Sequence, residues 1–131
     1  MRNRIILFVC KGNSGRSQIA EAFFNHFCNT AKAMSAGIEP DEKIHPWTIK
    51  VMNEVQINMK KHTPKQLTEE LMNRADRIIF LDSDISEKIP RKYLSKEENW
   101  QIEELLGKSI DQVREIRDEI KEKVLQLIEK L

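Results

Sequence analysis

The most constraining feature of the sequence is a buried strand followed directly by a loop of small residues and then by a helix. Residues 5–9 form a continuous β-branched and aromatic run, which is typical of a strand covered on both faces in a parallel sheet. Residues 10–16 are rich in Gly, Asn and Ser, and apolar residues then recur at three- and four-residue steps as far as Ala31. This order predicts a strand, a loop and a helix of an α/β fold.

Strands and helices continue to alternate along the chain. Pro46 suits the first turn of a second helix that continues to Ile57, and Thr68 opens a short third helix. Ser109 and Gln112 form a capping box that begins a terminal helix. The alternation predicts a parallel sheet with right-handed crossovers, and 131 residues suffice for one domain but not for two. Further strands are expected at residues 33–36 and 77–81 and near Trp100 and Ile102, with a helical turn over 83–89.

Charge and hydropathy argue against several classes of partner. Lys and Arg total 22 against 21 Asp and Glu, whereas a dedicated nucleic-acid or membrane-surface binder carries a strong basic excess. The longest apolar run, residues 5–10, is far shorter than the roughly 18 residues that suggest a membrane span. We therefore expect a cytoplasmic protein without a nucleic-acid or membrane partner. Two cysteines are also too few for a disulfide framework.

The loop at residues 10–16 has the composition of an anion-binding nest. Ligands of open α/β sheets bind beyond the carboxyl ends of the strands, which is where this loop begins. Glycine permits positive φ and asparagine tolerates the left-handed region, so successive backbone N–H groups can turn inward around an oxyanion. The amino terminus of the next helix favours the same negative charge, and Arg16 can hold two oxygens of a phosphate-like group. The substrate-binding candidates are Lys11, Gly12, Asn13, Ser14 and Gly15.

Cys10 is the candidate nucleophile. A helix amino terminus and a nearby guanidinium favour the thiolate form of a cysteine, so one loop can activate the sulfur and hold its target. The alternative is that Cys10 is a buried strand-end cysteine and Arg16 a surface residue. The position after a buried strand, with Gly-Asn-Ser-Gly between the two residues, favours catalysis.

The stretch from Val9 to Phe24, VCKGNSGRSQIAEAFF, resembles the active-site loop and first helix of the low-molecular-weight protein tyrosine phosphatase superfamily, which also includes thiol-coupled arsenate reductases. The similarity extends to MSAG at residues 34–37, to residues 45–67, to RADRIIFLD at 74–82, and to the final GKSIDQVREIRDEI. The resemblance implies one domain over residues 1–131, a flavodoxin-like three-layer sandwich around a four-stranded parallel sheet.

The resemblance also implies roles for individual residues. Cys10 would attack phosphorus to give a phosphocysteine, Arg16 would steady the transition state, and Ser17 would hydrogen-bond the sulfur. Asn13 would hold the left-handed turn of the loop by bonding to Ser35. No metal or cofactor is implied, and His26, His45 and His62 have no ligand spacing and are interpreted as structural.

The general acid is where the chain departs from the family. The family uses an Asp, usually followed by Pro, on a loop before the last helix. Alignment through Trp100 and residues 107–109 places Glu104 at the acid position and Leu105 at the proline. Glu carries its carboxyl about 1.5 Å further from the backbone, one C–C bond. Glu104 is the catalytic candidate, and the alternative is that Glu103 and Glu104 are solvated loop charges.

Cysteine positions bear on the branch of the family. An internal disulfide relay needs further cysteines after the third main strand, but residues 82–93 contain none, and Gly15 stands where some relatives have Cys. Cys28 would lie roughly 16 Å or more along a helix from the loop, whereas a disulfide needs Cα atoms within about 7 Å. Cys28 is therefore interpreted as a small core residue. Reduction by an external thiol needs only Cys10, and residues 45–66 resemble the reductase branch more closely.

The sequence thus predicts a hydrolase of phosphotyrosine-type phosphomonoesters, with a phosphorylated protein or a small phosphomonoester as substrate. One alternative is an arsenate reductase that uses an external thiol partner, and another is a phosphate-binding module without catalysis. Trp47 is a candidate for the pocket wall against an aromatic ring, and the alternative is a core or surface tryptophan. A monomer or weak dimer is expected.

Overall fold

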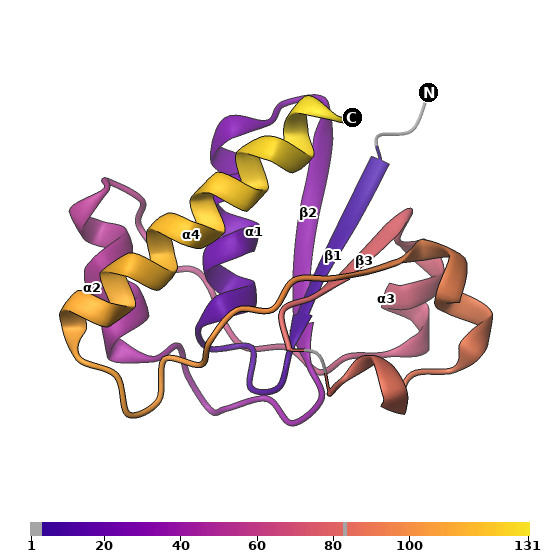
Figure 1. Ribbon diagram of the computed structural model, residues 1–131, viewed down its shortest axis with the longest axis horizontal. Helices are drawn as coiled ribbons and strands as arrows, with labels where there is room; N and C mark the ends of the chain where they lie inside the picture. Colours follow the sequence, from indigo (N-terminus) through magenta and orange to yellow (C-terminus); the bar gives the residue numbers. More distant parts are fainter. Residues whose placement is uncertain (1–3, 83) are drawn as a thin grey trace.

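The chain forms a four-stranded parallel sheet whose strands all point toward one edge of the molecule (Figure 1). The computed structural model describes residues 4–82 and 84–131. The order of strands across the sheet is β2-β1-β3-β4, with every neighbouring pair parallel, which is the predicted flavodoxin-like arrangement. The strands are β1 (Arg4–Cys10), β2 (Ala31–Gly37), β3 (Arg77–Phe80) and β4 (Glu97–Asn99).

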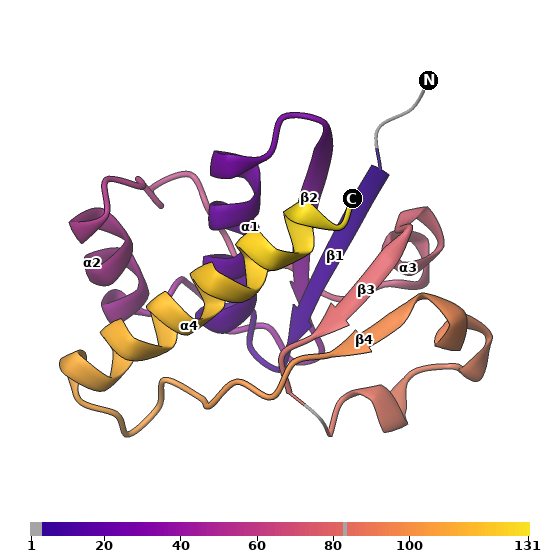
Figure 2. The same cartoon turned by 45° about the horizontal axis from the view of Figure 1, so that its top comes forward.

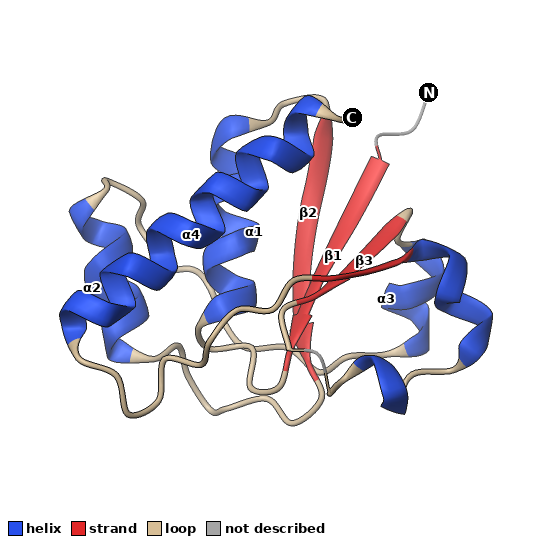
Figure 3. Cartoon of the chain, in the orientation of Figure 1, coloured by secondary structure: helices blue, strands red, loops and turns tan. Residues whose placement is uncertain are grey.

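Helices cover both faces of the sheet (Figures 1 and 2). The helices α1, α2 and α4 lie on one side, and α3 lies on the other with two short 3₁₀ helices, η1 and η2 (Figure 3). None of the helices within residues 4–82 and 84–131 combines the length and the apolar character that crossing a bilayer requires. The bounds are α1 (Arg16–Phe27), α2 (Pro46–Glu54), α3 (Glu69–Arg74), α4 (Ile110–Glu129), η1 (Ser86–Lys88) and η2 (Arg91–Lys96).

The alternation of side chains along β1 explains why its sequence is apolar without interruption. Ile6 and Phe8 belong to the core beneath α1 and α4, whereas Leu7 and Val9 belong to a second core beneath α3 and η2. All four side chains are at most 1% exposed. A strand buried on both faces cannot show a polar alternation, so the predicted three-layer sandwich follows from this strand.

Two helix starts were correctly predicted from capping residues. The Ser109 hydroxyl accepts from the backbone N–H of Gln112, whose side chain accepts from the Ser109 N–H, and α4 begins at the next residue. Thr68 caps α3 by accepting from the N–H of Leu71. These caps satisfy N–H groups that have no partner within their own helices.

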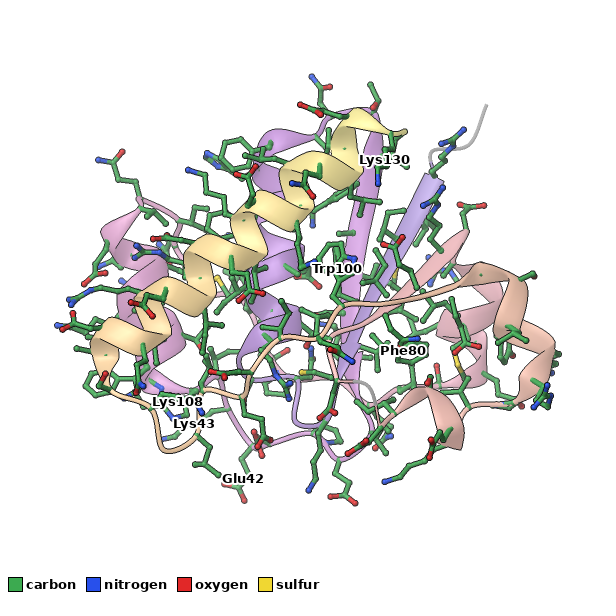
Figure 4. All side chains as sticks on the ribbon, in the orientation of Figure 1. Glu42, Lys43, Phe80, Trp100, Lys108 and Lys130 are labelled. Atoms are coloured by element: carbon green, nitrogen blue, oxygen red, sulfur yellow. The ribbon has the colours of Figure 1, made fainter. Side chains whose placement is uncertain are left out.

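Other predicted boundaries were wrong. The last strand is β4, not residues 100–102, so Trp100 follows the strand and packs its ring against Phe8, with centroids 5.6 Å apart (Figure 4). The helix α1 ends at Phe27, and Ala31 begins β2, while α2 ends at Glu54 before reaching Ile57. The turn expected over 83–89 starts outside the described residues, and the helical part described there is η1.

Candidate active site

A cavity of about 400 Å³ opens beside Cys10, the last residue of β1, at the edge of the sheet where the strands end. The loop between β1 and α1, residues 10–16, forms one wall. Figure 4 shows Glu42 and Lys43, from the segment after β2, on the same edge as Lys108, from the loop before α4. The remaining lining residues come from these two segments: Glu39, Asp41, His45, Glu104, Leu105 and Leu106.

The segment after β2 holds the outer side of the loop. Cys10 lies opposite Gly37 in the register of β1 and β2, so the two chains continue side by side beyond the sheet. The backbone N–H groups of Ile38, Glu39 and Asp41 donate to the carbonyl oxygens of residues 10, 11 and 12, respectively, at 2.9–3.3 Å. These carbonyl groups are therefore satisfied within the protein.

The start of α2 holds the next part of the loop in the same way. The carbonyl oxygen of Ser14 accepts from the N–H of His45 at 3.0 Å and from the Thr48 hydroxyl at 2.9 Å. The Ser14 hydroxyl donates to the Asp41 carboxylate at 2.5 Å. A Cβ at Gly12 would collide with that same carboxylate, so a larger residue there would displace the Asp41 side chain from this position.

The backbone N–H groups of residues 11–16 donate to no group in the described part of the chain. Gly15 occupies the N-cap position of α1 without a side-chain cap, so the first N–H groups of the helix are also unfilled. Since residues 10–16 line the cavity, these free N–H groups are donors that a ligand bound there could use. Free N–H donors at these positions are what the predicted nest for a tetrahedral oxyanion requires.

Asn13 fixes the shape of the loop from inside the protein. It has a φ of 50°, in the left-handed region that the sequence predicted, and its side chain is fully buried. Its amide nitrogen donates to the Ser17 hydroxyl at 2.7 Å. Its carbonyl oxygen accepts from the Gln18 amide at 3.0 Å and from the N–H of Lys65 at 2.8 Å.

The predicted bond between Asn13 and Ser35 is wrong. The Ser35 hydroxyl donates to the Glu21 carboxylate of α1 at 2.9 Å, because β2 carries it toward that helix. Burial alone raises the pKa of Glu21, but hydrogen bonds from His62 and Ser35 and the charge of Lys65 outweigh it and hold that pKa below its usual value. Ser35 therefore belongs to the surroundings of Glu21, not to the loop's left-handed turn.

A directed chain of hydrogen bonds ends at the sulfur of Cys10. The Gln18 amide nitrogen donates to Asn13 and to the Thr63 carbonyl, so its oxygen faces Nδ1 of His62 at 3.0 Å. The Ser17 oxygen accepts from Asn13, and its hydroxyl proton remains free to be donated to the Cys10 sulfur 2.9 Å away. The predicted contact between Ser17 and Cys10 is thus present, and the hydroxyl is its donor whenever the sulfur is a thiolate.

Arg16 is buried, and its guanidinium is held by two other strand ends. Its Nη1 donates to the carbonyl oxygens of Leu81 at 3.1 Å and Ile102 at 2.8 Å. Its Nη2 lies 3.4 Å from the Asp82 carboxylate and 3.9 Å from that of Glu104. The structure therefore brings Arg16 and Glu104 together at the cavity and adds Asp82, which the sequence interpretation did not include.

The two glutamates of the late loop differ in position. Glu104 lines the cavity and its side chain is 56% exposed, so solvent and a ligand can both reach its carboxylate. Glu103 is exposed and is not among the lining residues. Lys11 also lines the cavity and lies 4.0 Å from Glu39 across its rim.

His45 occupies the place on the cavity wall for which Trp47 was the candidate. Trp47 is 37% exposed and is not a lining residue. His45 is the N-cap of α2, where its Nδ1 accepts from the N–H of Trp47 at 3.0 Å. The position of His45 directly before Pro46 was the available sequence signal, because Pro favours the first helical position after an N-cap. Asp41 and Asp82 carried no comparable signal.

Cys28 is remote from this site. It is the C-cap of α1, whereas the loop precedes the other end of that helix. The helix has 12 residues, which at about 1.5 Å of rise per residue corresponds to about 18 Å. Cys10 and Cys28 are both free thiols, and this separation excludes a disulfide between them in the folded chain.

This arrangement is suited to nucleophilic displacement on a tetrahedral oxyanion. Free N–H groups and a fixed guanidinium can bind the oxygens, a hydrogen-bonded sulfur lies at the base, and a carboxyl group lies at the mouth. Within residues 4–82 and 84–131, no three His, Cys, Asp or Glu side chains are grouped so that they could hold a metal ion.

Known proteins resemble the chain over nearly its whole length. Arsenate reductase 2 of Staphylococcus saprophyticus is 34% identical over 128 residues, which cover 96% of this chain and 97% of that protein. The YwlE arginine phosphatase from Geobacillus stearothermophilus is 27% identical with a TM-score of 0.86, covering 97% of this chain and 92% of that one. The thioredoxin-dependent arsenate reductase of Corynebacterium glutamicum is 29% identical with a TM-score of 0.83, covering 98% of this chain and 61% of that one.

The sequence pattern described as low molecular weight phosphotyrosine protein phosphatase matches residues 5–131. The match includes the loop at residues 10–16, Asn13 with its buried partners, and the late loop that carries Glu104. The chain belongs to the low molecular weight phosphotyrosine protein phosphatase family.

Proposed function

We propose that the chain is a hydrolase of phosphotyrosine-type phosphomonoesters that works through a cysteinyl-phosphate intermediate. The observation that carries this proposal is the set of unoccupied N–H groups at residues 11–16 in the cavity that also contains Cys10, Arg16 and Glu104. Donors fixed before the ligand arrives stabilise charge on a transferring group without reorganising during the reaction. Either a phosphorylated protein or a small phosphomonoester can supply that group.

In the first step, the Cys10 thiolate attacks phosphorus and the bond from phosphorus to the ester oxygen breaks. The loop N–H groups and Arg16 hold the remaining phosphoryl oxygens. The leaving tyrosinate is the anion of a phenol whose pKa is about 10, so it needs a proton as it departs. Glu104, 3.9 Å from Nη2 of Arg16, is the carboxyl group that would supply the proton.

In the second step, water attacks the phosphocysteine and the bond from phosphorus to sulfur breaks. Glu104, now a carboxylate, takes a proton from the attacking water, and orthophosphate is released. The electron pair of the broken bond returns to the Cys10 sulfur. The resulting thiolate accepts a hydrogen bond from the Ser17 hydroxyl. The hydrogen bonds from Gln18 to Asn13 and from Asn13 to Ser17 orient the Ser17 hydroxyl toward the sulfur.

Arsenate reduction with an external thiol is the second candidate, favoured by the identity to arsenate reductases. Cys10 would bond arsenate with loss of water, and an external thiol would then attack the sulfur. Arsenic would take the electron pair and leave as arsenite, and a second thiol would reduce the mixed disulfide. The distance to Cys28 argues against an internal relay, so this reaction requires the separate thiol.

A paired assay tests these proposals. Hydrolysis of p-nitrophenyl phosphate is measured beside arsenate-dependent oxidation of a dithiol, each with a Cys10→Ser control. Phosphate release that the Cys10 substitution abolishes supports the hydrolase. Thiol oxidation without phosphate release overturns it in favour of the reductase. Calorimetric binding of orthophosphate with neither reaction would instead support a phosphate-binding module.

A further inference from the structure

Leu105 is a buried residue of the late loop that lies between two exposed neighbours. Glu104 is 56% exposed at its side chain and Leu106 is 77% exposed, yet Leu105 between them is only 6% exposed. The loop contains no regular secondary structure at this point. A single buried leucine between two exposed residues therefore acts as an anchor for the segment that carries the candidate acid.

The anchor is set directly against the phosphate-binding loop. A Cβ at Gly15 would lie 2.8 Å from Cδ1 of Leu105 and 3.2 Å from its Cγ. Real Cβ atoms essentially never make the shorter of these contacts, so the leucine occupies the space that the missing side chain of Gly15 leaves open. The Thr48 hydroxyl borders the same space at 3.7 Å. The Leu105 side chain thus packs directly against the backbone of Gly15.

A second anchor lies on the other side of the acid. Ile102 is 4% exposed, its carbonyl oxygen accepts from Arg16 at 2.8 Å, and its N–H donates to the Leu81 carbonyl at 3.4 Å. Residues 103 and 104 are held between these two points. Beyond Leu105 the chain turns, since the N–H of Lys108 donates to the Leu105 carbonyl at 3.1 Å and Gly107 has a φ of 78°.

We propose that Leu105 is a positioning residue for Glu104: its packing against Gly15 fixes the distance between the acid and the phosphoryl site. The inference rests on the proposed hydrolase function. A flexible glutamate on an irregular loop needs an external constraint, because a misplacement of about 1 Å at a reacting group can cost about a hundredfold in rate. Leu105 supplies this constraint through packing, at a position adjoining both the acid and the residue before Arg16.

The test compares Leu105→Ala with wild type on two aryl phosphates. Phenyl phosphate has a leaving group that needs a proton, whereas 2,4-dinitrophenyl phosphate has one that departs as a stable anion. The kcat/KM value reports the first step. We expect Leu105→Ala to lower kcat/KM for phenyl phosphate by roughly tenfold to a hundredfold. The value for the dinitrophenyl ester should change by less than about threefold, with orthophosphate inhibition unchanged.

Three controls separate positioning from general support of the fold. Leu105→Met keeps volume and apolarity, so it should restore most of the activity. Leu94→Ala removes a 59% exposed leucine of η2, outside the cavity lining, and should match wild type. In a Glu104→Gln background, adding Leu105→Ala should cause little further loss of activity on phenyl phosphate, because both substitutions remove proton donation by Glu104.

Melting curves are recorded first, and all kinetics are compared at a temperature where every variant is folded. Equal losses on the two esters, a full additional loss in the Glu104→Gln background, or weakened phosphate inhibition would overturn the proposal and leave Leu105 as a support of Gly15. A wild-type protein that hydrolyses neither ester would instead overturn the hydrolase function on which the inference rests. The two failures are therefore distinguishable.

Discussion

Arg16 uses its two terminal nitrogens for different purposes. Its Nη1 is held by the carbonyls of Leu81 and Ile102, and its Nη2 lies beside Asp82 and Glu104 at the cavity. Lysine has one nitrogen and cannot keep both sets of contacts, nor grip two oxygens in a plane. We expect Arg16→Lys to lower kcat/KM for p-nitrophenyl phosphate by about a hundredfold or more, measured by steady-state kinetics. Activity within a few-fold of wild type would remove the guanidinium from the proposed mechanism.

Asn13 contributes to the loop through its backbone conformation and through its side chain, and two substitutions separate the contributions. Both Asn13→Ala and Asn13→Gly leave Ser17, Gln18 and the Lys65 N–H without their partner, at a cost of about 1–3 kcal/mol for a buried polar group. Only Ala also meets strain at a φ of 50°. Urea unfolding should therefore show Ala less stable than Gly by about 1 kcal/mol. Equal stabilities would contradict a left-handed Asn13.

At the scale of elements, His45 joins the helix α2 to the loop at residues 10–16. Its ring caps the helix through the N–H of Trp47, and its backbone N–H holds the Ser14 carbonyl. Asparagine is among the best N-cap residues, so His45→Asn should unfold at nearly the wild-type urea concentration, whereas His45→Ala should lose about 1 kcal/mol. If both variants were equally destabilised, the ring would have a packing role in place of the cap.

Glu54 links α2 to α4 through a pH-dependent contact. It accepts hydrogen bonds from Arg114 at 2.7 Å and from Arg117 at 3.0 Å, and the Arg114 bonds in particular lower the pKa of Glu54 to about 2. A carboxyl whose pKa is lowered by folding adds stability that is present above its unfolded pKa and is lost as the pH falls toward 2. Glu54→Gln should therefore be less stable than wild type at pH 6, and the gap should narrow at pH 2.5. Urea unfolding at both values measures this, and a constant gap would exclude the titration.

The elements differ in how far the sequence could predict them, for physical reasons. The strand β1 and the helix α4 can be predicted from local sequence. Burial on both faces gives β1 a continuous apolar run, and a capping box marks the start of α4. The strand β4, Glu97–Asn99, is short and polar and pairs only with β3 at the sheet edge. The apolar residues Trp100 and Ile102 therefore led to a strand being predicted there, after the actual one. Its pairing is a tertiary effect that no periodicity encodes.

The same division applies to the site. Cys10, Arg16 and the left-handed Asn13 lie in one contiguous loop, so composition and spacing were enough to predict them. Asp41 and Asp82 reach the loop from other strand ends, and only the order β2-β1-β3 makes them neighbours of residues 10–16. The predicted hydrogen bond between Asn13 and Ser35 was wrong for a similar reason. The Ser35 hydroxyl donates to Glu21 of α1, and local sequence does not reveal this contact.

For the whole molecule, the unfilled N–H groups of residues 11–16 couple ligand binding to folding. We expect a tetrahedral oxyanion to bind the folded chain, where residues 11–16 line one cavity, and to find no corresponding site in the unfolded chain. At a phosphate concentration of a hundred times its dissociation constant, the stabilisation is about 2.7 kcal/mol. For a chain of this length, that corresponds to a rise in melting temperature on the order of 10 °C.

Calorimetric melting in phosphate and in chloride of equal ionic strength measures this coupling. Sulfate should act like phosphate because it has the same shape and oxygens, and chloride should raise the melting temperature little. Arg16→Lys should reduce the phosphate effect, since the guanidinium is one of the buried groups that an anion would satisfy. Equal shifts in phosphate and chloride would mean that salt acts on the whole surface, and the loop would then hold no specific anion.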